Sequence, residues 1–127
     1  MTTKGTGVLT YSFVDVAEIE PSGPGGVVRF VRRELGTTAF GINHFTLAPG
    51  TAGREHDETD SNQEEVMVVL AGSGSLRVDD DELELNPGRF VRLDPEATRV
   101  AVAGEEGLTF ITIGSPREEP YAPRGPF

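Results

Sequence analysis

Short apolar segments separated by glycine and proline turns are the feature that most restricts the fold of this chain. The 127 residues include 16 glycines and nine prolines, and turns recur at intervals of about ten residues. The segments between the turns alternate apolar and polar side chains, and none sustains the 3.6-residue period of an amphipathic helix. The pattern therefore predicts an all-β sandwich or barrel rather than a helix-rich fold.

The turns divide the chain into a series of expected strands. We expect strands at Val8–Val14, Val27–Leu35, Thr38–Leu47, Glu65–Ala71, Ser75–Val78, Glu82–Leu85, Phe90–Leu93, Arg99–Val102 and Leu108–Ile113. Gly72 and Gly74 predict a tight hairpin inside this series, because glycine tolerates the backbone angles of short turns. In the third strand, Phe45 favours the face that also carries Asn43 as the core face, which leaves His44 at a surface or an interface.

Composition narrows the classes of function. The formal net charge of −10 disfavours nucleic acid and anionic membrane surfaces as partners, because both need a basic patch. The chain has no cysteine, so disulfides, thiolate metal sites and cysteine nucleophiles are excluded. No apolar run reaches the ~20 residues that span a bilayer, and the N-terminus lacks the apolar segment of a signal peptide. We therefore expect a cytoplasmic protein.

Residues 1–127 are enough for one domain with one core. Residues 1–7 are small and polar, and we expect them to form a flexible N-terminus. Residues 116–127 are rich in proline and predict an extended C-terminal tail. Two interpretations of this tail remain open: it is a loose terminus, or Tyr121 and Phe127 hold it against the barrel or a neighbouring subunit.

A polar, turn-rich stretch before the strand at Glu65–Ala71 holds the side chains best suited to chemistry. His56 and Glu58 stand at positions i and i+2, so on an extended segment they point the same way. Glu65 begins the strand, and an inward phase would carry Met67 into the same interior. Imidazole nitrogen and carboxylate oxygen are ligands for divalent metals. The stretch therefore predicts a site built onto a β scaffold.

The same stretch resembles the first sequence motif of the cupin superfamily, G-x5-H-x-H-x3-4-E-x6-G. Five residues separate Gly50 from His56, and Glu58 stands where the family has its second histidine. Six residues separate Glu65 from Gly72, while the gap between the two glutamates is longer than the family's by two or three residues. Both halves of the motif therefore match in register.

The second cupin motif, G-x5-P-x-G-x2-H-x3-N, is eroded. An alignment that starts at Gly88 places Asp94 at the proline and Glu96 at the glycine. It also places Arg99 at the histidine and Ala103 at the asparagine. A guanidinium stays protonated and does not coordinate metals, and the chain has only two histidines. A three-histidine site of the usual cupin kind is therefore impossible within one chain.

The resemblance implies an all-β fold of the cupin kind, a double-stranded β-helix or jelly-roll barrel. It implies that His56, Glu58 and Glu65 correspond to metal ligands, with Zn, Mn, Ni or Fe as the candidate ions. It also implies a homodimer, because cupins commonly pack or exchange N-terminal strands. The mixed polar and apolar faces of the expected strand Val27–Leu35 agree with an interface there.

Three functions are compatible with these residues, because one fold hosts many functions. The first is a cupin-type small-molecule-binding protein of unknown ligand with an incomplete metal site, in which Arg99 forms forked hydrogen bonds with Glu58 or Glu65 and replaces the charge of the metal. The second is a metal-dependent cupin enzyme, a dioxygenase or an isomerase, that uses His56 and both glutamates. The third is a non-catalytic regulatory or partner subunit. The predicted ligand pocket contains Asn43, Phe45, His56, Glu58, Glu65, Met67 and Arg99.

Overall fold

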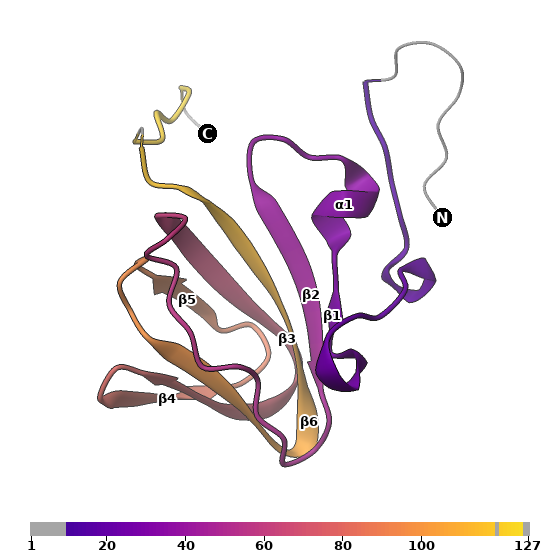
Figure 1. The fold of residues 1–127 in the computed structure, drawn as a ribbon, viewed down its shortest axis with the longest axis vertical. Helices are drawn as coiled ribbons and strands as arrows, with labels where there is room; N and C mark the ends of the chain where they lie inside the picture. The colour runs from indigo at the N-terminus through magenta and orange to yellow at the C-terminus, as the bar shows by residue number, and fades with distance from the viewer. Residues whose placement is uncertain (1–9, 119, 126–127) are drawn as a thin grey trace.

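Six strands and little helix make up the computed structural model, which describes residues 10–118 and 120–125 (Figure 1). The strands are β1 (Val28–Arg29), β2 (Gly41–Leu47), β3 (Gln63–Val78), β4 (Asp81–Leu85), β5 (Phe90–Leu93) and β6 (Arg99–Pro116). The helical elements are α1 (Val31–Leu35) and two 3-10 turns, Val16–Glu18 and Pro24–Gly26. No helix within the described residues is both long enough and apolar enough to cross a membrane. The all-β prediction is confirmed.

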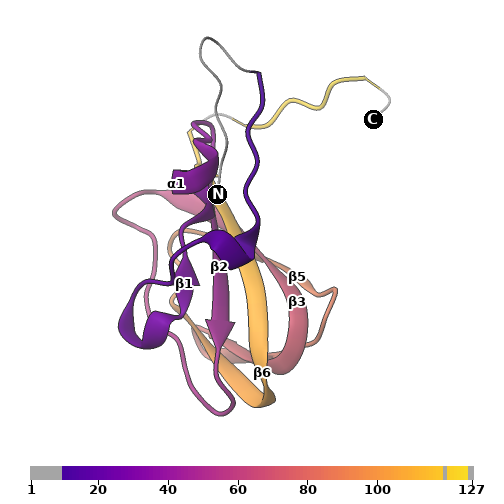
Figure 2. The same cartoon turned by 90° about the vertical axis from the view of Figure 1, so that its right-hand side faces the viewer.

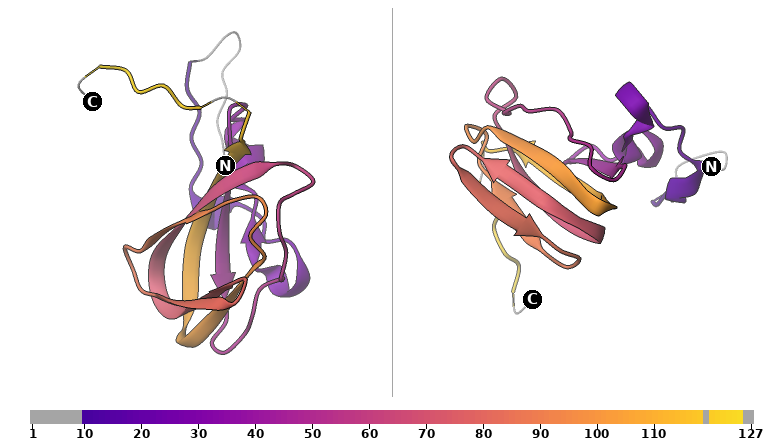
Figure 3. Two further views of the ribbon diagram at one scale, coloured as in Figure 1. Left: turned by 90° about the vertical axis from the view of Figure 1, so that its left-hand side faces the viewer. Right: turned by 90° about the horizontal axis from the view of Figure 1, so that it is seen from below.

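The two long strands β3 and β6 form the frame of the fold. They pair antiparallel along most of their length, and the strand order is β1-β2-β6-β3-β4, with β5 also paired to β3. The second half of β6 pairs with β2, and the second half of β3 pairs with β4. Arg99–Val102 and Leu108–Ile113, which we predicted as separate strands, are therefore two parts of one strand. Figure 3 shows the sheet curving round on itself, with β4 and β5 on the side away from α1.

The predicted hairpin at Gly72–Gly74 is wrong, because β3 continues through it. The register between β3 and β6 shifts on both sides of Gly72, and bulges of this kind bend a strand. A Cβ atom on Gly72 would lie 2.1 Å from the carbonyl oxygen of Gly107, and one on Gly74 would lie 2.2 Å from that of Val102. The two backbones approach too closely here for any side chain, so the glycines mark a bend shared by two strands rather than a turn.

The predicted strand Val27–Leu35 is wrong beyond its first residues. Only β1 pairs with β2, and the chain then turns into the short helix α1. Gly36 ends this helix in the left-handed conformation with φ 79°, and its N–H donates to the carbonyl of Arg32 at 2.7 Å. The helix buries none of its residues fully. The alternation of apolar and charged residues that suggested a strand therefore reflects a half-exposed segment, which carries little information on its conformation.

The predictions for the two ends of the chain have mixed outcomes. Of the expected strand Val8–Val14, residues 10–14 form no strand, and residues 8 and 9 lie outside the described residues, as do residues 1–7. The expected strand Thr38–Leu47 begins only at Gly41. Figure 2 shows the C-terminal tail leaving the barrel, and Tyr121 is 85% exposed, so this residue does not hold the tail against the barrel. Phe127 lies outside the described residues, and contact with a neighbouring subunit stays a prediction.

The core lies on the concave face of the curved sheet. Phe45 on β2 and Phe110 on β6 stack with ring centroids 4.9 Å apart. The inward phase that we predicted for Phe45 is confirmed, because the partner positions on β3 and β6 belong to the same apolar cluster. Side chains that are at most 3% exposed include Leu47, Met67, Val69, Leu76, Leu85, Leu93 and Leu108.

The opposite face of the same strands is also apolar. Strand pairing places side chains from β2, β6, β3 and β5 next to one another on this outer face. Most of them are half-buried, but Phe90 is 70% exposed. We call the set the outer apolar face. Its members are Ile42, Val66, Val68, Phe90, Ile111 and Ile113.

Candidate functional site

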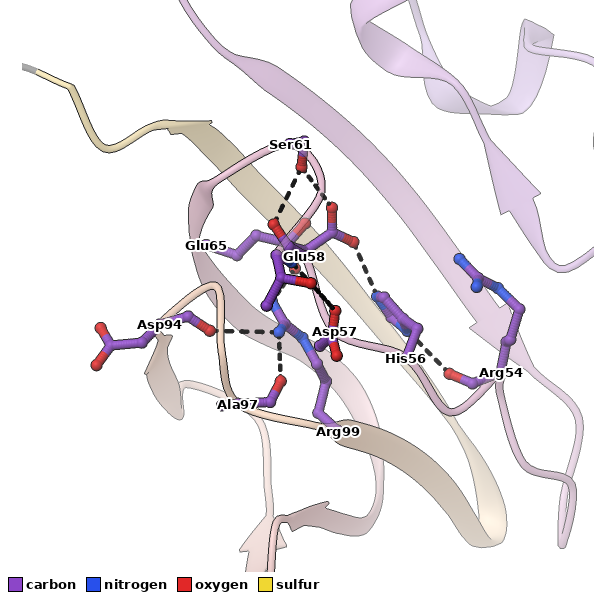
Figure 4. A network of polar contacts seen from close by, with 10 residues as sticks. Arg54, His56, Asp57, Glu58, Ser61, Glu65, Asp94, Ala97 and Arg99 are labelled. Atoms are coloured by element: carbon purple, nitrogen blue, oxygen red, sulfur yellow. Dashed lines mark hydrogen bonds and ion pairs between the residues drawn. The ribbon is translucent and has the colours of Figure 1, made fainter.

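The candidate site begins as a backbone pairing between two segments that are distant in the sequence. After β2 the chain runs antiparallel to the first half of β6, through the bridges Ala52–Val102 and His56–Arg99. His56 and Arg99 exchange two backbone hydrogen bonds of 3.0 and 2.9 Å. Directly opposed residues of antiparallel strands carry their side chains on the same face. The two side chains are therefore neighbours (Figure 4).

Arg99 is the one charged side chain that is buried among the described residues, with 3% exposed. Its Nη2 donates to Oε1 of Glu65 at 2.8 Å. Its Nη1 donates to the carbonyl oxygens of Ala97 at 2.6 Å and Asp94 at 3.4 Å, while its buried Nε has no partner. A buried charge is tolerated only with a partner of opposite sign. Glu65 is that partner, and it reaches Arg99 from β3.

His56 and Glu58 form a second contact beside this ion pair. Nε2 of His56 lies 3.1 Å from Oε2 of Glu58, and Nδ1 lies 3.0 Å from the carbonyl oxygen of Arg54. Because a carbonyl can only accept, Nδ1 carries a proton in this contact. Nε2 then has two roles open to it: it carries a second proton and donates to Glu58, or it presents a lone pair to a cation that it shares with this carboxylate.

Two short hydrogen-bonded turns hold the loop that carries these residues. Ser61 donates from Oγ to Oε1 of Glu58 at 3.0 Å. The Oδ1 atom of Asp57 accepts from the backbone N–H of Thr59 at 3.1 Å and from its hydroxyl at 2.8 Å. These hydrogen bonds, the backbone one most, lower the pKa of Asp57. Asp57 therefore stabilises the loop, and Ser61 orients the carboxylate of Glu58.

The three predicted metal ligands lie together. One ligand atom from each of His56, Glu58 and Glu65 lies within 4.8 Å of the other two, and all three residues are half-buried. Together with Arg99 they form what we call the Arg99 cluster. The four residues that the two motifs marked therefore lie together in the structure. They come from the loop after β2, from β3 and from β6.

A cavity of about 450 Å³ lies next to α1, where β2 begins and β6 ends. We call it the α1 cavity. Asn43 is the one predicted pocket residue that lines it. Phe45 and Met67, which we also predicted as pocket residues, pack in the core instead. The lining includes Phe30, Arg32, Arg33, Phe40, Asn43 and Gln63.

His44 faces away from the Arg99 cluster. It pairs with Arg29 across β1 and β2, on the side of the sheet that carries the outer apolar face. Its Nδ1 is buried without a hydrogen-bond partner. Burial, and then the positive charge of Arg29, lower the pKa of His44 below its usual value. This placement agrees with the prediction that His44 is not a ligand.

Comparison with known families agrees with this geometry. The family model of the cupin domain matches residues 43–114, which is more than half of the chain. The chain belongs to the cupin family. A search of curated proteins found no match.

Solved cupin structures share the fold. A cupin protein from Bacteroides fragilis is 20% identical with a TM-score of 0.77, over 92% of this chain and 93% of that one. A Cupin 2 conserved barrel domain protein from Salinispora arenicola is 16% identical with a TM-score of 0.67, over 87% and 92%. A predicted oxalate decarboxylase from Thermotoga maritima is 16% identical with a TM-score of 0.69, over 81% and 97%. At such identities the likeness shows the fold alone.

This cupin has donors for a metal ion, but it also has a competing cation. A tetrahedral ion with bonds of 2.0–2.2 Å needs donor atoms about 3.3–3.6 Å apart, and the donors of His56 and Glu58 meet that condition at 3.1 Å with little adjustment. Glu65 offers a ligand atom within 4.8 Å of both, but its Oε1 is already bonded to Arg99. The guanidinium supplies the charge that an ion would supply and repels a second cation. The residues therefore do not fit a complete cupin metal centre.

Sequence reasoning missed the side of the α1 cavity that α1 itself provides. Phe30, Arg32 and Arg33 fall in the segment that we predicted as a strand, and Gln63 falls in the gap between Glu58 and Glu65, where the cupin motif marks no residue. One signal was available: Arg32 and Arg33 are adjacent cations in a chain with a net charge of −10. A cleft lined by charges of one sign attracts ions of the opposite sign.

Proposed function

We propose that this cupin binds a small molecule without a resident metal ion, and that the Arg99–Glu65 ion pair occupies the place of the metal. The observation that carries the proposal is the burial of Arg99, which is 3% exposed and lies 2.8 Å from Glu65. The position corresponds to the eroded histidine of the second cupin motif. A fixed internal cation there leaves no need for an external one.

The surroundings of the ion pair support a binding role. Arg99 is held by two backbone carbonyls as well as by Glu65, so its position does not depend on a ligand. His56 and Glu58 remain half-buried, and their side chains can donate to or accept from a polar group of a bound molecule. The α1 cavity has a volume within the range of small-molecule sites, about 300–1,000 Å³.

Metal analysis tests the first part of the proposal. Protein purified without chelator is expected to hold far less than one equivalent of Zn, Mn, Ni or Fe, and its melting temperature is expected to stay unchanged when these ions are added. Stoichiometric metal in the wild type, lost in His56→Ala, would contradict the proposal. Native mass spectrometry of the same sample then tests the second part, by detecting a small molecule that is retained by the folded protein.

One observation favours the metal-dependent alternative, a dioxygenase or an isomerase. The Nδ1–H of His56 points at a backbone carbonyl, an arrangement that typically orients a metal-ligating histidine. With Glu58 and Glu65 it would offer one imidazole and two carboxylates, a weak set that favours hard ions. This function requires Glu65 to leave Arg99. A rise in melting temperature with Mn or Fe(II), at unchanged pH, would support it.

We also propose a cytoplasmic homodimer, with the outer apolar face as its interface. Phe90, Val68 and Ile111 form a row of apolar side chains that a monomer would leave in contact with water. Light scattering is expected to show about twice the 13.6 kDa of one chain, and Val68→Glu is expected to give a monomer. A wild-type monomer at micromolar concentration would contradict this, and would favour the third function, a subunit that pairs with a different protein.

A further inference from the structure

We propose that the α1 cavity binds a small organic carboxylate, with the carboxylate at Arg32 and Arg33 and the apolar body between the phenylalanine rings. This rests on the proposed function, because it assigns the ligand class of a cupin that binds a small molecule. None of the four residues of the Arg99 cluster lines the cavity. The cavity therefore has its own set of recognition groups.

The two arginines carry the argument, because they are adjacent cations in the cavity lining and have no carboxylate partner among the described residues. Among the described arginines, Arg92, Arg99 and Arg117 form ion pairs. No described carboxylate lies within ion-pair distance of Arg32 or Arg33, and unlike the other arginines without an ion pair these two line the cavity. The whole chain has 21 acidic residues against 11 basic ones, so carboxylates are available in excess. Two adjacent guanidinium groups in one cavity, with no carboxylate partner among the described residues, favour an anion from outside the chain.

Local contacts hold both guanidinium groups at the edge of the cavity. Arg32 donates from Nη1 to the carbonyl oxygen of Thr37 at 3.1 Å. The Cζ atom of Arg33 lies 4.6 Å from the centre of the Phe30 ring, a cation–π contact that leaves the N–H groups at the guanidinium edge free to donate. A side chain that is already oriented loses less entropy when it binds a ligand. The arginines are therefore positioned for forked hydrogen bonds to a carboxylate.

The cavity lining also includes two amide side chains that form no hydrogen bond with a described side chain or backbone group. The half-buried side chains of Asn43 on β2 and Gln63 on β3 line the cavity, and neither forms a hydrogen bond with another described residue. Polar groups that are half-buried and unpaired gain most from a ligand that can donate or accept. Phe40, which is 41% exposed, and Phe30 supply apolar walls. A carboxylate with an apolar or aromatic body matches all three kinds of lining.

Gly114 connects the cavity to the Arg99 cluster. A Cβ atom at this position would lie 2.8 Å from Oε1 of Gln63 and 3.1 Å from Cγ of Glu65. Glycine at this point of β6 therefore lets the side chains of the cavity and of the cluster lie against the same piece of backbone. Because Gly114 lines the cavity and Glu65 does not, a ligand in the α1 cavity would lie near the Arg99 cluster without being part of it.

Isothermal titration calorimetry of the full chain with benzoate tests the proposal. Benzamide, its neutral analogue of the same shape, serves as the probe for charge, and inorganic phosphate serves as the probe for a simple anion site. We expect benzoate to bind and benzamide to bind at least about tenfold more weakly, which corresponds to one charge-assisted hydrogen bond. Equal binding of the two aromatic probes, or no binding of benzoate, would overturn the proposal. So would phosphate that binds as tightly as benzoate.

Two variants and a matched control locate the site. Arg33→Gln is expected to weaken benzoate binding about tenfold, and Asn43→Asp is expected to abolish it by placing a carboxylate in the cavity. Arg77→Gln changes the net charge by the same amount at an exposed position on the second half of β3, and it is expected to leave benzoate binding unchanged. If Arg77→Gln weakens binding as much as Arg33→Gln, the effect is one of overall charge and the proposal fails.

The two proposals fail separately. Stoichiometric metal in the wild type would contradict the proposed function, while the benzoate titration would still report on the cavity. Conversely, a metal-free protein that does not bind benzoate would agree with the proposed role of the Arg99–Glu65 ion pair. It would contradict the proposal that the ligand is an organic carboxylate.

Discussion

Arginine side chains define two neighbouring regions of this cupin, and they do so in opposite ways. In the Arg99 cluster the guanidinium is 3% exposed and is bonded to Glu65 and two carbonyls. In the α1 cavity Arg32 and Arg33 are exposed and pair with no described carboxylate. A buried cation must be neutralised by the protein itself, whereas an exposed cation is solvated and remains available to bind an anionic ligand. The difference separates a group that supports the fold from groups that are available for binding.

The largest expected effect comes from Arg99→Ala. Removing one partner of a buried ion pair leaves the other charge without compensation, so we expect a loss of about 3–5 kcal/mol in the free energy of unfolding. Denaturant titration measures it. The control is Arg92→Ala, whose side chain is 66% exposed and pairs with Asp94 and Glu64; surface pairs contribute about 0–1 kcal/mol. Equal stability of Arg99→Ala and wild type would mean that Arg99 behaves like an exposed arginine. The difference between the Arg99 cluster and the α1 cavity would then not hold.

The next effect concerns the replacement of the internal cation by an external one. Arg99→His restores the ligand of the second cupin motif and frees Glu65, so the site would hold two imidazoles and two carboxylates. We expect Zn to raise its melting temperature. At a metal concentration of 100 times Kd, binding adds about 2.7 kcal/mol to the free energy of unfolding. The wild type is expected to show little change. The double variant His56→Ala/Arg99→His should lose the response. A double variant that keeps it would show that the metal binds elsewhere.

A smaller effect is expected from the double variant Arg32→Gln/Arg33→Gln. Both side chains are exposed, and surface substitutions usually change stability by no more than about 0.5 kcal/mol. The same denaturant titration should therefore place this variant close to wild type. A loss comparable to that of Arg99→Ala would mean that the α1 arginines support the fold, and the distinction between the two regions would not hold.

The smallest effect is a pH dependence that belongs to neither region. The pKa of His44 is lowered from 6.5, by burial first and by Arg29 second. The unfolded chain therefore binds a proton more readily than the folded one, and stability falls as pH drops below 6.5. His44→Gln should flatten this fall between about pH 7 and pH 5, above the range in which most carboxylates titrate. An unchanged slope would exclude His44 as its source.

The sequence predicted the Arg99 cluster because two kinds of information agree there. Alternation placed Glu65 on the same face as the buried Met67, and the motif spacing placed His56 and Arg99 in corresponding positions of the family. It did not determine which partner Arg99 would take, since Glu58 and Glu65 both remained candidates. The choice depends on distance in three dimensions: Glu65 comes within 2.8 Å of Nη2, while Glu58 contacts His56 and Ser61 instead.

By itself, the sequence determined the all-β class, the inward face of β2 and the residues of the Arg99 cluster, because alternation and motif spacing are local patterns. Only the tertiary structure decided the rest. Gly72 and Gly74 predicted a hairpin from the sequence. In the structure, glycine is required there because the backbone of β6 at Gly107 and Val102 lies too close for any side chain. The α1 cavity likewise exists only because α1, β2, β3 and the end of β6 meet. The apolar periodicity of a segment shows which of its faces is buried. It does not show which distant segment covers that face, so such contacts cannot be predicted from the pattern alone.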